Sequence, residues 1–312
     1  MRKLSLAVCA LSVSLFACKK DVAPGTPAAP GDDKKVALTI RTNDFLQQVE
    51  AIPGANNKTA GTAGTAGDTA LATKVSFINY LLFDGAGNLL HMRSQQADWD
   101  QDFGTITDSA APGNYTIVMT ASQKPVDEGA VSQLSTFIFY VQLAGMGFID
   151  ATPDIFYKKE NITITNSSDP VDVNLAMDRL VGNLQVNILD MPQPADGDTT
   201  ASIQISSETP QFMASSGIAN WGTSGIVKAN VKRVGLNAFS AYVLNTVSAF
   251  DVTIHYVDHT GQPQTKVISN VQCYKNRRTI LSGYLFGGAP ANSGIKVTLL
   301  DSWSDNDNEV QF

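Results

Sequence analysis

The side chains that most often catalyse reactions or bind metals are those of histidine and cysteine and the carboxylates. This sequence has few of them at a spacing that would form a site. Its three histidines are His91, His255 and His259, and none stands in a metal-binding spacing such as H-E-x-x-H. The sequence contains no G-x-S-x-G nucleophile elbow and no phosphate-binding glycine loop. Cys273 lies in an apolar segment without a neighbouring histidine, so we expect a buried, unreactive thiol.

Acidic residues near the C-terminus could supply the oxygen ligands that calcium prefers. Their spacing lacks the glycine and the distal glutamate of an EF-hand loop, so a solvated acidic turn is the better interpretation. The sequence therefore predicts no catalytic residue, no cofactor and no metal, and we do not expect an enzyme. The acidic residues concerned are Asp301, Asp305, Asp307 and Glu309.

Three tryptophans could bind sugars, because an exposed indole ring can stack on a pyranose. Trp221 lies in the loop sequence Asn220–Gly225, where exposure would be easiest, and the others are Trp99 and Trp303. Packing in a core or at a domain interface is the commoner environment of a tryptophan, and it is the interpretation we prefer for all three.

The N-terminal residues indicate a different chemistry, the attachment of lipid to a cysteine. Two basic residues precede an apolar run from Leu4 to Phe16, which is shorter than the about 20 residues needed to cross a bilayer. Such a run suits a signal peptide, and it ends in Leu15-Phe-Ala-Cys18, which resembles a lipobox. We expect residues 1–17 to be removed and Cys18 to carry lipid such as palmitate. The alternative is an ordinary secretory signal with an incidental cysteine.

Composition limits the remaining possibilities. The formal net charge is -7, and loss of the two basic residues of the signal leaves 20 basic against 29 acidic residues, a net -9. An acidic, lipidated protein is a poor candidate for nucleic-acid binding. Cys9 would leave with the signal and Cys18 would be acylated, so Cys273 has no disulfide partner in the chain. A hydrophobic core must therefore hold the fold, and 43% hydrophobic residues can supply one.

Composition also divides the chain into segments. Residues 18–35 are rich in proline, alanine and charge, and predict a flexible tether. A Thr-Ala-Gly repeat in Lys58–Ala70 predicts a loop. A turn cluster at 166–170 predicts the boundary between an N-terminal domain at 36–168 and a C-terminal domain at 169–312.

The pattern inside both domains is that of β-strands. Leu184-Gln-Val-Asn-Ile188 alternates apolar and polar side chains, as a half-buried strand does. The strand-like run Val75–Phe83 meets a turn at Asp84–Asn88 and then a second run, which predicts a hairpin. Another hairpin turn is expected at His259–Pro263, and no long amphipathic helical pattern occurs. Many short strands between turn signals predict an all-β chain of two tandem β-sandwiches.

Five short motifs follow one another along most of the mature chain: Leu15-Phe-Ala-Cys18, Asn79–Asn88, Pro112–Val118, Leu175–Arg179 and Thr279–Phe286. In this order they resemble the fimbrillin-like lipoproteins of Bacteroidetes, especially the fimbrial-anchoring subunits of that group. The resemblance implies two transthyretin-like β-sandwiches in an outer-membrane, lipid-anchored subunit on the cell surface. It also implies cell adhesion as the role and other fimbrial (pilus) subunits as the partners.

The resemblance further implies assembly by strand complementation, in which one subunit lends a strand to the open sheet of another. The candidate exchangeable strands are Val36–Arg41 and Ile295–Leu300, near the two ends of the folded region. Shaft subunits of the family are trimmed after an early arginine. Arg41 is the only arginine between Cys18 and Arg93, so trimming is conceivable but not indicated.

The alternative function is that of a surface glycan-binding lipoprotein in a polysaccharide uptake system. An exposed aromatic platform would favour this alternative, whereas an unpaired sheet edge or a swappable terminal strand would favour the fimbrial function. Three short sequences at 68–70, 108–110 and 198–200 are similar to O-glycosylation acceptors of these bacteria, and we expect them in loops.

Overall fold

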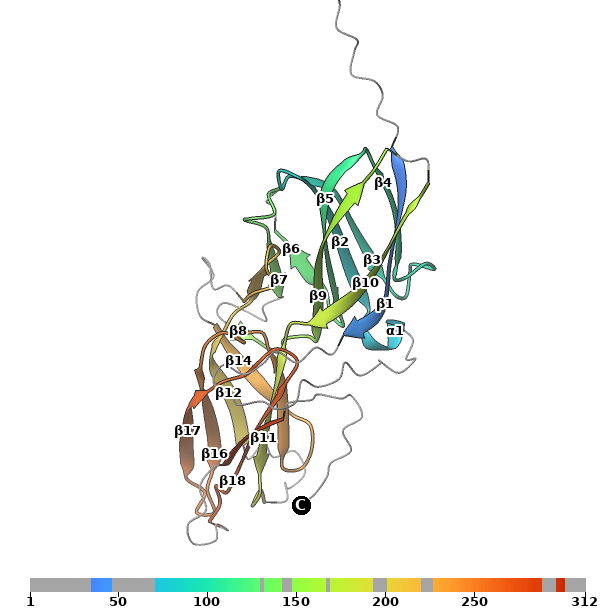
Figure 1. Cartoon of the computed structure of the whole chain (residues 1–312). Coiled ribbons are helices and arrows are strands. Elements are labelled where there is room, and N and C mark those ends of the chain that lie inside the picture. The colour runs from blue at the N-terminus through green and yellow to red at the C-terminus, as the bar shows by residue number, and fades with distance from the viewer. Residues whose placement is uncertain are drawn as a thin grey trace, which may run out of the picture. The chain divides into compact units, whose positions relative to one another are not determined.

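Figure 1 shows the computed structural model of the chain, which consists almost entirely of β-strands. The structure describes residues 35–46, 71–129, 132–141, 148–166, 169–192, 201–219, 227–287 and 296–300. Within these ranges the only helix is the single turn α1 (Leu71–Lys74), and no helix is long and apolar enough to cross a membrane. Lys34–Phe312 form one compact unit. The predicted signal peptide, Cys18, the Thr-Ala-Gly loop and the acidic tail lie outside the described residues.

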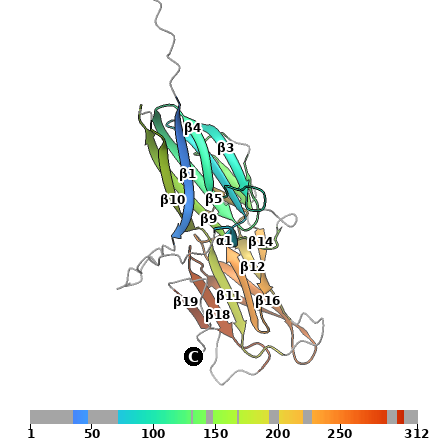
Figure 2. The ribbon, with the colours of Figure 1, turned by 90° about the vertical axis from the view of Figure 1, so that its right-hand side faces the viewer.

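The first sandwich is a curled sheet of seven strands in the order β3-β2-β5-β9-β10-β1-β4. Figure 2 shows β1 between β10 and β4. Neighbouring strands are antiparallel except β1 and β10, which run parallel. The strands are β1 (Val36–Leu46), β2 (Phe77–Asp84), β3 (Leu89–Gln96), β4 (Thr105–Ala110), β5 (Gly113–Ser122), β9 (Ile155–Ile164) and β10 (Val171–Arg179).

Burial along β2 explains why apolar side chains occupy consecutive positions in it. Ile78, Tyr80 and Leu82 point into the core of the first sandwich, whereas Leu81 and Phe83 point to the other face and enter a separate apolar cluster. All five side chains are fully buried. A strand covered on both faces needs apolar side chains at consecutive positions, and not the alternation of a half-exposed strand.

The second sandwich is a curled sheet in the order β17-β16-β12-β14-β15-β11-β18-β19, with β8 paired to β14. Leu184, Val186 and Ile188 of β11 enter its core, while Gln185 and Asn187 between them are half-buried, as the alternation predicts. The strands are β8 (Phe148–Ile149), β11 (Gly182–Ile188), β12 (Ala201–Glu208), β14 (Val227–Arg233), β15 (Ala238–Val243), β16 (Phe250–Val257), β17 (Pro263–Val271), β18 (Arg278–Gly283) and β19 (Lys296–Leu300).

A third, small sheet contains strands from both halves of the sequence. β13 (Gln211–Met213) pairs with β7 (Ile138–Val141), which pairs with β6 (Val126–Glu128). Phe139 of β7 stacks on Phe212 of β13 with ring centroids 5.1 Å apart, and Phe137 packs against Phe139 at 5.3 Å. These rings belong to an apolar cluster that also contains Leu180 and Leu244. Because the cluster draws on both sandwiches, its burial stabilises the junction between them.

Carboxylates fix the two predicted hairpin turns. Asp84 accepts hydrogen bonds from the backbone N–H groups of Ala86 and Asn88 in the β2–β3 turn. Asp258 accepts them from Thr260 and Gln262 in the β16–β17 turn. Hydrogen bonds stabilise the charged form of each carboxyl group. They therefore hold the pKa of Asp84 and the pKa of Asp258 below the usual range. Both turns thus satisfy their own backbone groups locally.

The structure confirms an all-β chain of two tandem β-sandwiches. The division into domains at 168/169 stays a prediction. β10, which follows that point, pairs with β1 and β9 of the first sheet, and the second sheet begins at Gly182 apart from the two-residue strand β8. Sheet membership therefore favours a boundary after Arg179.

Candidate functional site

β1, which contains the first predicted exchangeable strand, is an inner strand of the first sandwich. Its segment Val36–Arg41 pairs with β4, and most of β1 pairs with β10 on the other side (Figure 2). Leu38 and Ile40 are fully buried in the core, and the Arg41 guanidinium forms an ion pair with Asp172 at 2.9 Å. Withdrawal of β1 would open a gap between β4 and β10 and uncover the core.

β19, within the second predicted exchangeable strand, has the opposite placement. It is the last strand of its sheet and pairs only with β18 in the part of the chain that the structure describes. The antiparallel register runs from Ser282 opposite Lys296 to Arg278 opposite Leu300. An edge strand with one partner can leave its sheet by breaking one ladder of hydrogen bonds, whereas an inner strand must break two.

The other edges of the two large sheets are β17, β3 and β4. β17 is almost wholly exposed and carries Lys266 beside the exposed Val267. Charged side chains on an edge discourage uncontrolled pairing with another sheet. β3 also carries a charge, at Arg93.

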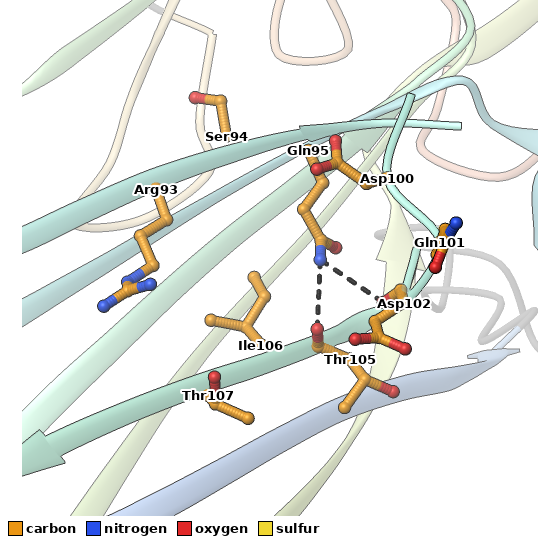
Figure 3. Close-up of a pocket in the computed structure, with 9 residues that line it drawn as sticks. All are labelled: Arg93, Ser94, Gln95, Asp100, Gln101, Asp102, Thr105, Ile106 and Thr107. Carbon is orange, nitrogen blue, oxygen red and sulfur yellow. Dashed lines mark hydrogen bonds between the residues drawn. The ribbon is translucent and has the colours of Figure 1, made fainter. Parts of the chain in front are cut away.

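Hydrogen bonds of side chains, and not main-chain pairing of strands, join the two edge strands of the first sandwich, β3 and β4 (Figure 3). Gln95 of β3 donates from Nε2 to the carbonyls of Asp102 at 3.3 Å and Thr105 at 3.0 Å. The backbone N–H of Gly104 donates to Gln95 Oε1 at 3.0 Å. A polar cavity of about 400 Å³ lies beside these contacts.

A buried carboxylate forms a second closure between the same edges. Asp108 of β4 accepts a hydrogen bond from the Tyr80 hydroxyl at 3.0 Å, and its Oδ2 lies 2.8 Å from His91 Nδ1 of β3. Burial and then the Asp108 carboxylate raise the pKa of Tyr80 above its ordinary value. Residues 108–110, expected in a loop as a glycosylation sequence, therefore lie in β4 with Asp108 only 3% exposed, so that expectation was wrong. The other two such sequences lie outside the described residues.

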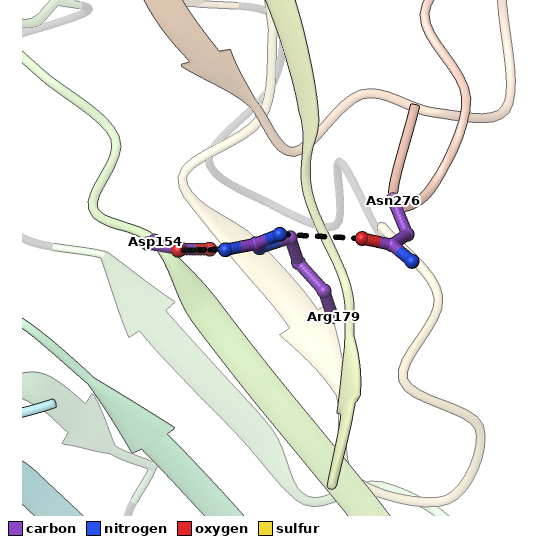
Figure 4. Close-up of polar contacts among 3 residues, drawn as sticks. All are labelled: Asp154, Arg179 and Asn276. Carbon is purple, nitrogen blue, oxygen red and sulfur yellow. Dashed lines mark hydrogen bonds and ion pairs between the residues drawn. The ribbon is translucent and has the colours of Figure 1, made fainter. Parts of the chain in front are cut away.

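An ion pair is buried where the two sandwiches meet (Figure 4). Arg179 donates from Nε to Asp154 Oδ1 at 2.9 Å and from Nη2 to Oδ2 at 2.8 Å, and its Nη1 donates to Asn276 Oδ1 at 3.3 Å. The guanidinium also lies 4.9 Å from the centre of the Phe156 ring. The two-pronged contact fixes β10 against the segment that precedes β9, and the bond to Asn276 joins β10 to the loop that precedes β18.

Glu208 at the end of β12 is fully buried. Its carboxylate accepts hydrogen bonds from the backbone N–H groups of Thr209 at 2.8 Å, Asn245 at 2.8 Å and Leu244 at 3.1 Å. Burial nevertheless outweighs these donors and raises the pKa of Glu208 to about 7. The residue therefore fixes the point where the chain leaves β12 for β13, and its charge depends on pH near neutrality.

The described residues thus form two sandwiches with open sheet edges. A family model described as "Fimbrillin-A associated anchor proteins Mfa1 and Mfa2" matches residues 30–272. The chain belongs to this family. No curated protein matches the sequence.

Solved structures share the fold of this fimbrial anchor family member at low sequence identity. The fimbrial anchor protein Mfa2 from Porphyromonas gingivalis is 11% identical, with a TM-score of 0.53 over 85% of this chain and 97% of that one. A candidate polysaccharide-binding protein from Bacteroides thetaiotaomicron is 8% identical, with a TM-score of 0.55 over 85% and 98%. A candidate adhesin from Bacteroides ovatus is 9% identical, with a TM-score of 0.51 over 86% and 94%.

Family membership gives the chain a structural, fimbrial and adhesive role at the cell surface, with other fimbrial subunits as partners. Within the described residues no group of three or more histidine, cysteine, aspartate or glutamate side chains could hold a metal ion. The acidic tail, for which a solvated turn was expected, lies outside them.

The structure confirms the burial of the fimbrial protein's Cys273. The thiol is 0% exposed, and burial raises its pKa to about 12, so it is protonated and unreactive at neutral pH. His255 in β16 and His259 in the β16–β17 turn are both exposed, as expected.

The expected packing of Trp99 was wrong. Its side chain is 81% exposed, the largest exposure among the large hydrophobic residues described. Trp221 and Trp303 lie outside the described residues. Sequence reasoning also missed Arg179, Asp154 and Glu208, because a single charged residue at a strand end carries no local signal of burial.

Proposed function

We propose that this chain is a lipid-anchored anchor or accessory subunit of a fimbria, held in the outer membrane through Cys18. We propose further that it assembles by strand complementation. The observation that supports complementation is the placement of β19, an edge strand near the C-terminus with a single described neighbour. When such a strand leaves its own sheet, its main-chain hydrogen bonds can form again with the sheet of another subunit. The first sandwich stays intact in this exchange.

β1 is poorly suited to the donating role. It is buried on the core side and paired on both sides, so a free β1 would require opening of the first sandwich. The Arg41–Asp172 ion pair adds a cross-strand contact to this pairing. We propose that β1 stays in place in the anchored subunit and that β19 is the strand that exchanges.

A disulfide lock tests the exchange of β19. Ser282 and Lys296 are register partners in β18 and β19, so the double variant Ser282→Cys/Lys296→Cys should hold β19 in its own sheet when oxidised. We expect oxidation to abolish co-assembly with other fimbrial subunits and reduction to restore it. His255→Cys/Thr265→Cys, which locks the β16–β17 hairpin at exposed register partners, is the matched control and should assemble in both states. Unchanged assembly of the oxidised β19 lock would refute strand exchange through β19.

Crosslinking on intact cells tests the fimbrial function itself. We expect pull-down of this chain and mass spectrometry to recover other tandem β-sandwich subunits in a ladder. Recovery of an outer-membrane transporter with glycan-binding lipoproteins, and of no fimbrial subunit, would support the uptake alternative. One observation favours that second candidate, the exposed indole of Trp99, although one chain can carry both a strand for assembly and a surface for sugar.

A further inference from the structure

The loop between β3 and β4, residues 97–104, exposes one aromatic residue and buries another. Trp99 is 81% exposed, whereas Phe103 packs against the core of the first sandwich. An exposed indole does not gain the free energy that burial of its large apolar surface would provide. The loop therefore leaves the Trp99 indole exposed to water, although its other aromatic side chain, that of Phe103, is packed against the core.

The loop is held by hydrogen bonds along its length. The backbone N–H of Gln96 donates to Asp100 Oδ2 at 2.6 Å, and the N–H groups of Trp99 and Asp100 donate to the Gln96 carbonyl at 3.0 and 2.9 Å. At the far end the Thr42 N–H donates to the Gly104 carbonyl at 3.0 Å. A platform on such a loop is ordered before a ligand arrives, which reduces the entropy lost on binding.

Gly104 is required for this arrangement. Its φ of +91° is a conformation that side chains disfavour, and an added Cβ would lie 2.3 Å from Leu71 Cδ2. The positive φ of Gly104 and the close approach of Leu71 in α1 thus determine the backbone conformation at the end of the loop.

Three residues that follow Trp99 line the polar cavity between β3 and β4: they are Asp100, Gln101 and Asp102 (Figure 3). Arg93 and Thr107 lie on the opposite side of the cavity, and Ile106 lies between the two groups. The cavity of about 400 Å³ lies within the roughly 300–1,000 Å³ of ligand-binding pockets.

Several polar groups of the cavity are uncommitted. Among the described residues, no hydrogen bond or ion pair joins the Arg93 guanidinium, the Gln101 amide or the Asp102 carboxylate to another side chain. The guanidinium offers donors at one side and the carboxylate offers acceptors at the other. Paired donors and acceptors of this kind match the vicinal hydroxyls of a sugar, which both donate and accept.

We infer that the β3–β4 loop and the adjoining cavity form a binding site for a neutral pyranose oligosaccharide. One sugar ring stacks on the Trp99 indole, and the hydroxyls of its neighbour bind Arg93 and Asp102 in the cavity. Mixed charge in the cavity argues against a strongly anionic ligand, since Asp100 and Asp102 would repel it. This site goes beyond assembly and supplies a surface that could hold a fimbrial subunit to glycan.

A glycan array with the purified mature chain, followed by titration with the bound oligosaccharide, tests this inference. We expect binding of at least one neutral hexose oligosaccharide, a loss of about tenfold or more in Trp99→Ala, and a loss of about twofold or less in Trp99→Phe. Asp102→Asn should weaken binding while leaving the stacking surface. Val234→Ala, which truncates another exposed hydrophobe on the second sandwich at 66% exposure, is the matched control and should bind as the wild type does. The indole is exposed, so these variants should fold normally.

Two outcomes would overturn the site. One is the absence of binding to every neutral oligosaccharide on the array, and the other is binding that Trp99→Ala leaves within twofold. In the first case, dependence of subunit crosslinking on Trp99 would show that the platform contacts protein. The disulfide lock on β19 reports assembly separately, so failure of the sugar site leaves the proposed fimbrial function standing.

Discussion

Arg179 is a single residue on which the junction between the sandwiches depends. Removal of its guanidinium would leave the 5%-exposed Asp154 carboxylate without its main counter-charge. Arg179→Ala should therefore lower the free energy of unfolding by about 3–5 kcal/mol. Urea unfolding of the purified chain measures the change.

Arg41→Ala is the matched control for Arg179→Ala. Its ion pair with Asp172 is half-exposed, so truncation should cost about 0–1 kcal/mol. Equal losses in the two variants would contradict a special role for the buried pair.

Glu208 should make stability depend on pH. Its pKa is about 7 in the folded chain and near 4.3 when unfolded, so between these values the folded state retains a proton that the unfolded state releases. The stability contributed by this group is therefore present below about pH 4.3 and falls by roughly 3 kcal/mol as the pH rises to about 7. Urea unfolding at several pH values measures it.

Glu208→Gln isolates this effect from the other carboxylates of the chain. The amide does not titrate, so the wild type should lose stability relative to the variant as the pH rises through the same window. A difference between the two proteins that stays constant with pH would show that Glu208 remains charged throughout.

At the scale of elements, β1 determines whether the folded chain can be trimmed. A protease must bind several residues in an extended form, and Arg41 lies inside a strand that is paired on both sides. We expect an arginine-specific protease to leave the Arg41–Thr42 bond intact under native conditions and to cut it in denaturant. N-terminal sequencing of the products measures this.

The exposed β16–β17 region provides an internal standard for the proteolysis. Its strands contain no arginine, so Lys266 on the exposed edge strand β17 can be probed with a lysine-specific protease in parallel. A native product that begins at Thr42 would show that β1 opens readily. It would indicate that the exchanged strand is β1 and not β19.

At the scale of the whole molecule, the lipid should be dispensable for folding. Residues 18–35 are rich in proline, alanine and charge, a composition that predicts a flexible tether and not a part of either core. Cys18→Ala should therefore release the protein from membranes and leave its thermal midpoint unchanged, as fractionation after a salt wash and thermal unfolding would measure. Retention of the variant on salt-washed membranes would contradict lipid anchoring through Cys18.

The sequence alone determined the class of the fold and much of its local structure. Alternation in Leu184–Ile188, the turn at Asp84–Asn88 and the run Val75–Phe83 depend on the chain's own neighbours, so they predicted strands and hairpins correctly. The order of five short motifs indicated the family, which the family match confirmed. Burial of Cys273 followed from its apolar neighbours.

Only the tertiary structure decided which strands meet and which side chains are buried or exposed. β10 pairs parallel with β1 across about 130 residues of sequence, and no local pattern records such a partner. The same limit applies to Arg179 and Glu208, whose burial depends on segments brought from elsewhere in the chain. Trp99 shows the converse, because a residue type that is usually packed stays in water when Phe103 already anchors its loop.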